Sequence, residues 1–330
     1  MLKVASYYSY KLLNRIRLKR LSFHQNIKSL PGIIKFLQDF PFRRQIILCF
    51  GDAQLVHYGD QLFFLPVALL LKRFDFQITI FNPGKLLHLW EYFNFPIVSD
   101  SSRFYEGALC ISKDDMFSIL YPLLLKHKCH FIGFNFGKMN GSEAISKLVA
   151  IEIISLIQQL DTSFNIIPTS LNSFFEEEFS SSVIWESLNG STPKCLLKLD
   201  QVLRQKSIVF SDFLNSGFWQ AAWRRHHLYK LADELNRDFT LIYVGSQMEK
   251  KLSKPSFINI DLRGETLPSD LFYLFSHPLV VGYAGFDTYP LHVATLCGKS
   301  LYVVKKSSFM DEKKFIPFLP NHEKLVRIIK

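Results

Sequence analysis

The sequence predicts an α/β protein built from two domains that each contain a parallel sheet. Its 330 residues exceed the usual size of one domain. Short apolar runs alternate with longer amphipathic stretches, which is the pattern of strands joined by crossover helices. This alternation occurs twice. Hydrophobic residues make up 48% of the chain and charged residues 21%, which excludes a largely disordered protein.

The first alternation covers residues 45–160, which we interpret as an N-terminal Rossmann-like domain. Apolar runs predict four strands, and the amphipathic stretches between and after them predict four helices. The strands are Gln45–Phe50, Phe76–Phe81, Ala108–Ser112 and Cys129–Asn135, and the helices are Gln61–Phe74, Lys85–Phe93, Asp114–Lys126 and Ser142–Gln159.

The second alternation covers residues 207–330, a C-terminal Rossmann-like domain. Residues 161–206, rich in Ser, Asn and Thr, are interpreted as an interdomain connector. Two such halves predict a cleft between facing sheet ends, where doubly wound folds bind ligands. The predicted strands are Ser207–Ser211, Thr240–Val244, Phe257–Asp261, Leu279–Gly282 and Ser300–Val304, and the helices are Trp223–Asn236, Ser269–Phe275 and Tyr289–Cys297.

Cysteine usage and hydropathy indicate the cellular compartment. The five cysteines lie far apart without a CxxC pair, which argues against a disulfide framework or a structural zinc site. No apolar run reaches the roughly 18 residues that a membrane span needs. The N-terminus lacks the continuous apolar stretch of a secretory signal. We therefore expect a cytoplasmic protein.

Residues 1–44 are interpreted as a basic amphipathic leader. Residues 1–45 hold ten Lys or Arg and one acid, Asp39, and so carry nine of the ten net positive charges. Leu, Ile and Tyr side chains interleave with these charges at roughly helical spacing, as in a helix lying on a membrane. We expect residues 1–40 to bind an anionic membrane surface. The alternative is a helix that packs on the protein body, and no nucleic-acid partner is expected because the body has no basic surplus.

The first candidate site is Asp60, which lies between the first strand and the first helix. As an N-cap or first-turn residue, Asp60 could accept a hydrogen bond from a backbone N–H and cap that helix. It could instead face the ligand cleft and take a proton from an acceptor hydroxyl. Asp52, earlier in the same loop, is a rival for the second role.

The second candidate site is Gly282–His292, after the apolar strand Leu279–Gly282. Asp287 or Thr288 is the natural N-cap of the next helix. A helix start that follows a strand and a glycine-containing loop can bind phosphate. His292 lies about one turn into this helix, where it would either make a structural hydrogen bond or donate to a diphosphate or sugar.

Three segments, in order, resemble glycosyltransferase family 9, the bacterial heptosyltransferases. Gly59–Arg73 (GDQLFFLPVALLLKR) is similar to the family's opening helix, and Ile260–Leu267 resembles its Asp-Leu-x-Gly-x-Thr segment. Asp287–Val304 (DTYPLHVATLCGKSLYVV) is similar to its later signature, Asp-Thr/Ser-Gly-Pro-x-His-x-Ala followed by a strand. The resemblance extends from about residue 45 to residue 305.

The resemblance implies a GT-B fold, two Rossmann-like domains that face a central cleft. It also implies inverting, metal-independent transfer of a heptose-like sugar from a nucleotide-diphospho-sugar, with no cofactor. The N-terminal domain would bind the acceptor, a lipid-linked glycan such as the lipopolysaccharide core, and the C-terminal domain would bind the donor. Such an enzyme would work on the inner face of the cytoplasmic membrane.

The resemblance also assigns roles to residues. Asp60 would be the general base, and Thr288 with the following backbone N–H groups would hold the diphosphate. Asp287 would contact the hydroxyls of the donor sugar, and Glu249 would recognise the ribose. The remaining donor-binding residues would be Ser216, Gly217, Arg224, Tyr289 and His292.

Three positions depart from the family pattern and suggest other functions. Tyr289 stands where the family has glycine, Ala221 where it has lysine, and Arg224 where it has proline; Arg224 or Arg225 could restore the missing cation. One alternative is therefore a non-catalytic binding or assembly protein with the same fold. Another is a different GT-B enzyme, such as a nucleotide-sugar epimerase.

Overall fold

The computed structural model has a strand or helix at each element expected in the two Rossmann-like domains, and the chain forms two compact units. The units are Met1–Pro168 and Thr169–Lys330, divided within the segment interpreted as a connector. The predicted α/β class is confirmed. The structure describes residues 26–50, 58–84, 87–100, 104–136, 138–139, 145–165, 196–197, 199–212, 221–286, 288–304 and 326–329.

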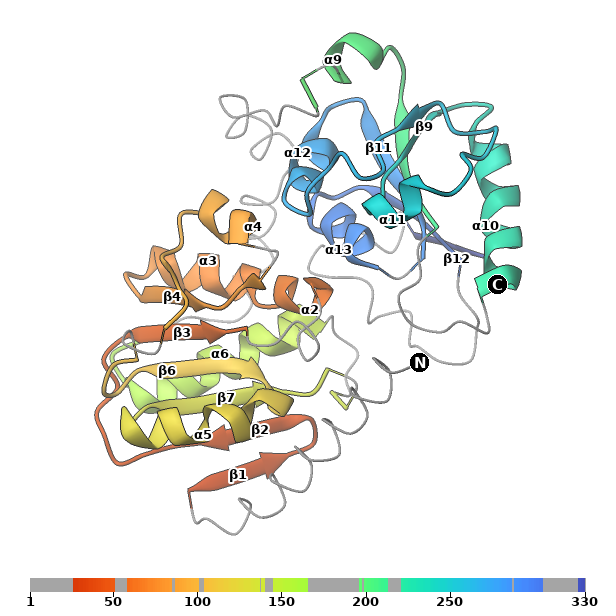
Figure 1. Cartoon of the computed structure of the whole chain (residues 1–330). Helices are drawn as coiled ribbons and strands as arrows, with labels where there is room; N and C mark the ends of the chain where they lie inside the picture. The colour runs from red at the N-terminus through yellow and green to blue at the C-terminus, as the bar shows by residue number, and fades with distance from the viewer. Residues whose placement is uncertain are drawn as a thin grey trace. The chain divides into compact units, whose positions relative to one another are not determined.

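A seven-stranded sheet forms the centre of the first unit (Figure 1). Its order is β1-β2-β7-β6-β3-β4-β5, in which β3 to β7 are parallel and β2 runs antiparallel to both β1 and β7. β3, β6 and β7 are buried over nearly their whole length, which explains their continuous apolar sequences. The strands are β1 (Ile27–Leu30), β2 (Ile33–Phe36), β3 (Gln45–Cys49), β4 (Gln77–Phe81), β5 (Ile97–Val98), β6 (Leu109–Lys113) and β7 (His130–Phe134).

Helices cover both faces of this sheet. Phe117 of α5 packs on Phe131, whereas Phe64 at the start of α3 packs on Phe134. Because neighbouring strand residues point to opposite faces, α5 and α3 lie on opposite sides, and α6 contacts α3. The helices are α2 (Tyr58–Leu62), α3 (Leu65–Arg73), α4 (Leu87–Tyr92), a 3-10 turn (Asp114–Met116), α5 (Phe117–Lys126) and α6 (Ile145–Leu160).

The predicted helix Gln61–Phe74 is two helices in the structure, α2 and α3. Pro66 explains the break, because it has no N–H to donate to the carbonyl of Leu62 and its ring collides with that carbonyl in a continuous helix. Pro66 instead occupies the first turn of α3, where proline is tolerated. The break leaves Asp60 on a short separate helix.

The second half of the predicted leader belongs to the sheet. β1 and β2 form a hairpin, and β2 pairs with β7. Lys35, one of the leader's charges, lies 3.1 Å from Glu152 of α6, and Arg44 lies 2.7 Å from Asp161. The leader is therefore shorter than predicted, because apolar strand residues and local ion pairs attach residues 26–44 to the first unit. The predicted interfacial helix lies in residues 1–25, outside the described residues.

The second unit is built on a six-stranded, entirely parallel sheet of order β10-β9-β8-β11-β12-β13. Its core packs apolar side chains of α10 against β8 and β9. No described helix of either unit is long and apolar enough to cross a membrane. The elements are α9 (Leu199–Val202), β8 (Ser207–Ser211), α10 (Ala221–Leu235), β9 (Thr240–Tyr243), α11 (Gln247–Lys250), β10 (Ile260–Asp261), α12 (Asp270–Ser276), β11 (Val280–Gly285), α13 (Tyr289–Leu296), β12 (Ser300–Val304) and β13 (Val326–Ile329).

In each sheet there is a point at which successive parallel strands stop being added on one side and begin to be added on the other. In the first unit this switch lies between β3 and β6, and in the second between β8 and β11. The connections after these paired strands lead away from each other, so the carboxyl ends of the strands border a crevice in folds of this type. Functional side chains are therefore expected at those two edges.

We predict that Gly107→Ala destabilises the first unit more than Gly84→Ala does. Both glycines have positive φ, +78° and +59°. A Cβ at Gly107 would collide with the carbonyl oxygen of Pro41, whereas a Cβ at Gly84 meets no described atom within 4 Å. The shared backbone penalty is about 1–2 kcal/mol. The collision should add about 1–3 kcal/mol at residue 107.

The measurement is the free energy of unfolding in urea for the two variants and the wild-type protein. Gly84→Ala is the matched control because it carries the same backbone penalty and the same change in the unfolded chain. Equal losses of stability in the two variants would contradict the predicted close approach of Gly107 to Pro41.

Candidate functional site

Two charged side chains meet at the switch of the first sheet. Lys113 is the last residue of β6, and Asp60 lies in α2, which follows β3 along the chain. Lys113 Nζ lies 2.6 Å from Asp60 Oδ2, and the two side chains are 14% and 20% exposed. The pair is mostly withdrawn from water, which strengthens the attraction between its charges.

Neighbouring side chains hold α2 in place. Gln61 is buried; it accepts a hydrogen bond from Trp90 Nε1 at 3.0 Å and donates one to the carbonyl of Pro83 at 3.1 Å. These bonds attach α2 to α4 and to the segment after β4. Asp60, the preceding residue, is therefore presented from a fixed backbone.

Asp60 had two possible roles, as a helix cap or as a base. Within the described residues its side chain accepts a hydrogen bond from Lys113 and none from a backbone N–H, and Oδ1 has no partner. This arrangement does not match a simple cap, and it leaves one carboxylate oxygen open. The rival Asp52 lies in residues 51–57, outside the described part of the chain.

A second carboxylate lies at the same edge. Asp114 directly follows Lys113, and its Oδ2 accepts a hydrogen bond from Asn135 Nδ2 at 2.9 Å. Burial raises the pKa of Asp114, and the neighbouring carboxylate of Asp115 raises it further. Asp114 thus has a side-chain partner after β7, whereas Asp60 Oδ1 has no partner in the part of the chain that the structure describes.

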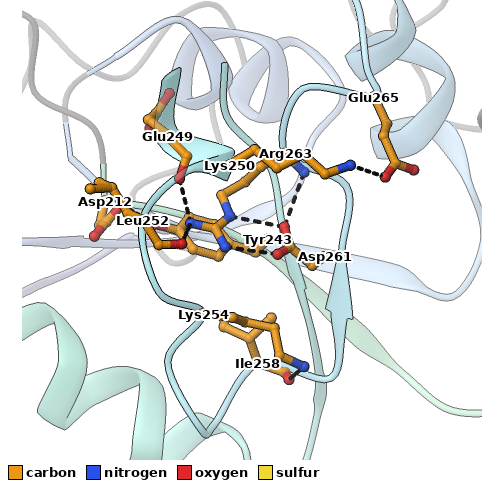
Figure 2. A network of polar contacts seen from close by, with 10 residues as sticks. All are labelled: Asp212, Tyr243, Glu249, Lys250, Leu252, Lys254, Ile258, Asp261, Arg263 and Glu265. Atoms are coloured by element: carbon orange, nitrogen blue, oxygen red, sulfur yellow. Dashed lines mark hydrogen bonds and ion pairs between the residues drawn. The ribbon is translucent and has the colours of Figure 1, made fainter. Parts of the chain in front are cut away.

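At the carboxyl edge of the second sheet, Arg263 organises a buried polar network (Figure 2). Its Nε and Nη2 donate to the two carboxylate oxygens of Asp261 at 2.9 and 2.8 Å. Its Nη1 donates to the carbonyls of Glu249 and Leu252 at 2.6 and 3.1 Å, and the guanidinium lies over the ring of Tyr243. The hydrogen bonds from Arg263 to Asp261 lower the pKa of Asp261. The contacts of Arg263 together join β9, α11 and β10.

Glu249, the predicted ribose-recognising acid, caps its own helix. Its Oε2 accepts a hydrogen bond from the Ser246 backbone N–H at 2.6 Å, forming a capping box at the start of α11. Its Oε1 is buried and has no hydrogen-bond partner among the described residues. Burial raises the pKa of Glu249, because the ionised form loses solvation.

Asp212 was not recognised from the sequence. It directly follows β8 and is only 3% exposed. Its carboxylate accepts hydrogen bonds from the hydroxyls of Tyr229, at 2.6 Å, and Tyr243, and Arg225 Nε lies 3.7 Å away. An acid directly after the apolar run Ser207–Ser211 was the available signal, as was Lys113 directly after Ala108–Ser112.

The start of α13 is shaped by Tyr283. The Tyr283 hydroxyl donates to the Phe286 carbonyl at 3.0 Å and lies 3.2 Å from Thr288 Oγ1. A Cβ on residue 285 would collide with this hydroxyl, so Gly285 is needed for the tight passage from β11 to α13. Thr288, one of the two residues predicted as the N-cap of α13, occupies that position, and its side chain makes no capping hydrogen bond.

Tyr289 joins α13 to the segment before α12. Its hydroxyl donates to the carbonyl of Pro268 at 3.0 Å, and burial raises its pKa. Among the first backbone groups of α13, Pro290 has no N–H and the Leu291 N–H donates to the Thr288 carbonyl at 3.0 Å. This helix start therefore has fewer N–H groups for an anion than an ordinary one.

The other predicted donor-site residues are only partly described. His292 is half-buried in α13, and Ala221 and Arg224 lie in α10, where their side chains are not described. Ser216, Gly217 and Asp287 lie outside the described residues. Asp60 belongs to the first unit, and Glu249, Thr288, Tyr289 and His292 belong to the second. The described residues contain no cluster of His, Cys, Asp and Glu that could hold a metal ion.

Comparison with solved structures identifies the architecture. The chain is similar to ADP-heptose lps heptosyltransferase II of E. coli, with 14% identity, a TM-score of 0.50, and 86% of this chain and 90% of that chain covered. The two proteins share a fold. A second similar structure is a glycosyl transferase of family 9 from Veillonella parvula, with 14% identity, a TM-score of 0.49, and 89% and 88% of the chains covered. No protein-family model and no curated protein matches the sequence.

The predicted GT-B fold is thus confirmed, with one Rossmann-like sheet in each unit. The second sheet has the strand order 3-2-1-4-5-6 of a dinucleotide-binding fold when its strands are numbered along the chain. In both GT-B units the candidate residues lie at the carboxyl edge, where such sheets bind ligands.

We predict that Arg263→Lys lowers the free energy of unfolding by about 2–4 kcal/mol. Lysine keeps the charge but cannot form the two-pronged bond to Asp261 or satisfy both carbonyls, so buried polar groups lose partners. The control is Lys250→Met in the same network, which removes the exposed ion pair with Glu265, whose side chains are 41% and 44% exposed. The control should change stability by about 0–1 kcal/mol. Chemical denaturation measures both, and similar small losses would contradict a structural role for the Arg263 network.

Proposed function

We propose that the protein is an inverting glycosyltransferase that needs no metal or cofactor. It would move a heptose-like sugar from a nucleotide-diphospho-sugar to a lipid-linked glycan such as the lipopolysaccharide core. The observation that carries this proposal is Asp60, a carboxylate at the switch of the first sheet whose Oδ1 has no partner among the described residues. A carboxylate in that position can take a proton from a hydroxyl. The fold shared with the E. coli heptosyltransferase supports the proposal.

In the proposed reaction Asp60 Oδ1 takes the proton of the acceptor hydroxyl while the hydroxyl oxygen attacks the anomeric carbon. The bond between that carbon and the donor's phosphate oxygen breaks, and the nucleoside diphosphate leaves with the electron pair. Attack from the side opposite the leaving group inverts the anomeric configuration. The rate depends on stabilising the charge of the leaving diphosphate, which positioned donors can do without a metal.

Residues of the second unit would supply that stabilisation. We propose that Thr288 and the start of α13 hold the diphosphate, that Asp287 contacts the sugar hydroxyls and that Glu249 binds the ribose. Recognition of the ribose by Glu249 requires its carboxylate to become accessible, because Glu249 Oε1 is buried. Further donor contacts would come from Ser216, Gly217, Arg224, Tyr289 and His292.

One observation favours a second candidate, a binding or assembly protein that keeps the fold without transferring sugar. At the start of α13, Tyr289 replaces the family's glycine, Pro290 has no N–H, and the Leu291 N–H bonds to Thr288. These features reduce the backbone donors for a diphosphate. The two candidates differ in whether nucleotide-diphospho-sugars bind.

We predict that Asp60→Asn leaves donor binding near normal and lowers turnover by about 10²- to 10⁴-fold, the usual loss when a general base is removed. Binding is measured by thermal shift against a panel of nucleotide-diphospho-sugars, and turnover by sugar transfer with the donor that binds. Asp52→Asn is the control and should do much less. No thermal shift with any donor would favour the binding protein, and unchanged turnover in Asp60→Asn would overturn the assignment of the base.

We also propose that the protein is cytoplasmic and that its N-terminal segment holds it on the inner, anionic face of the membrane, where a lipid-linked acceptor lies. Residues 1–25 contain six Lys or Arg and no acid. Near an anionic surface each basic residue contributes about 1 kcal/mol, and the attraction is screened beyond a Debye length of about 8–10 Å.

Changing Arg15, Arg17, Lys19 and Arg20 to Gln should therefore abolish binding to vesicles of anionic lipid without changing the melting temperature. Cosedimentation with vesicles, with and without about 0.5 M salt, measures this, because screening removes the attraction. The matched control changes the exposed Lys126, Lys206, Lys230 and Lys251 of the body to Gln. Salt-insensitive binding, or equal losses in both variants, would contradict a membrane role for the leader.

A further inference from the structure

We infer that Lys113 is a positioning residue that holds one oxygen of the Asp60 carboxylate, so that the other oxygen faces the acceptor hydroxyl. The inference rests on the proposed function, because it requires Asp60 to be the base. The observation behind it is the contact of 2.6 Å between Lys113 Nζ and Asp60 Oδ2 at the switch of the first sheet.

The backbones that carry both side chains are held firmly. Lys113 ends β6 opposite Phe134 of β7, and Ile111 in the same strand pairs with Leu48 of β3. Asp60 precedes Gln61, whose buried amide is bonded at both ends. A contact between two fixed elements has little freedom to vary, so it determines the orientation of the carboxylate.

The surroundings direct Lys113 to Asp60 rather than to another acid. Asp114 is the nearest carboxylate in sequence, but it accepts a hydrogen bond from Asn135. The ring of Phe136 lies 5.8 Å from Lys113 Nζ and offers its face to the ammonium. Phe136 itself packs edge-on against Phe63, between α2 and α3. The ammonium of Lys113 therefore has an aromatic ring near it as well as the carboxylate of Asp60.

Stability alone is a weak reason for this pair. Taking two charges out of water opposes folding, and a buried ion pair is often no more stabilising than apolar side chains of similar size. The pair also leaves Asp60 Oδ1 unpartnered among the described residues, and the Asp60 side chain is 20% exposed, so this oxygen can bond to water or to a substrate hydroxyl. A fixed carboxylate with one open oxygen suits a base.

Lys113 would act without changing its own protonation. The hydroxyl proton passes to Asp60 Oδ1, the acceptor oxygen bonds to the anomeric carbon, and the diphosphate leaves with the electrons of the broken bond. Throughout, Lys113 stays an ammonium that donates to Oδ2.

The test compares Lys113→Met with Lys113→Arg and with a matched control, Lys35→Met. Lys35 makes a similar contact of 3.1 Å with Glu152 in the same unit, with side chains 10% and 34% exposed, but it lies on β2 and not beside Asp60. We expect Lys113→Met to lower kcat about 10- to 100-fold with little change in the donor KM. Lys113→Arg should recover part of kcat, and Lys35→Met should leave kcat unchanged.

The double variant Asp60→Asn with Lys113→Met separates this inference from the proposed function. If Lys113 acts through Asp60, the second change should lower kcat no further in the Asp60→Asn background. Loss of turnover in Asp60→Asn combined with normal kcat in Lys113→Met would overturn the inference alone. If Lys113→Met lowers kcat by the same factor in the wild-type and in the Asp60→Asn background, the inference is also overturned. No transfer by the wild-type protein, or unchanged turnover in Asp60→Asn, would overturn the proposed function and this inference with it.

Discussion

Parallel pairing of β3 with β6, and of β8 with β11, is the constraint on which the rest of the structure depends. A parallel pair needs a crossover connection, so the chain leaves each of these strands at the same edge of its sheet. The two connections then turn to opposite sides, and polar groups that follow the strands gather between them. Lys113 at the end of β6 and Asp212 directly after β8 both owe their positions to this geometry.

The two edges use their polar groups differently. In the first unit, Asp60 and Lys113 form a pair in which Asp60 Oδ1 has no hydrogen-bond partner among the described residues. In the second unit, two buried charged side chains are bonded to internal partners: Arg263 donates to Asp261 and to two carbonyls, and Asp212 accepts from two tyrosine hydroxyls. The described polar groups of the second edge thus hold three strands, β8, β9 and β10, and two helices, α10 and α11, together. In the first edge, the Asp60 carboxylate has the geometry that the proposed base requires.

This difference matters for the proposed donor site. Arg263 is 2% exposed and committed to internal partners, so it offers no cation to a diphosphate. Tyr283, Gly285 and Thr288 instead shape the start of α13 through hydroxyl and carbonyl contacts. In the proposed enzyme, affinity for the donor therefore depends on neutral hydrogen-bond donors and on the helix start, together with cations from α10.

Much of the fold could be predicted from the sequence because parallel strands buried on both faces are continuous apolar runs. Ser207–Ser211 and Ser300–Val304 match β8 and β12 at both ends. The hairpin of β1 and β2 was not predicted because its short strands lie in a segment rich in basic residues. Its attachment to the first unit comes from the pairing of β2 with β7 and from the contact of Lys35 with Glu152, which are distant in sequence. The two-residue strands β5 and β10 are likewise defined by their neighbours.

The candidate site divides in the same way. The sequence by itself determined that Asp60 follows a buried strand near the start of a helix, and that Thr288 begins a helix after another strand, because both facts depend on neighbouring residues. Only the tertiary structure decided what these side chains contact. Lys113 lies 53 residues from Asp60 along the chain, and Tyr243 lies 31 residues from Asp212. Such pairs arise from the lateral order of strands in a sheet, which is set by packing of the whole unit and not by any local pattern of residues.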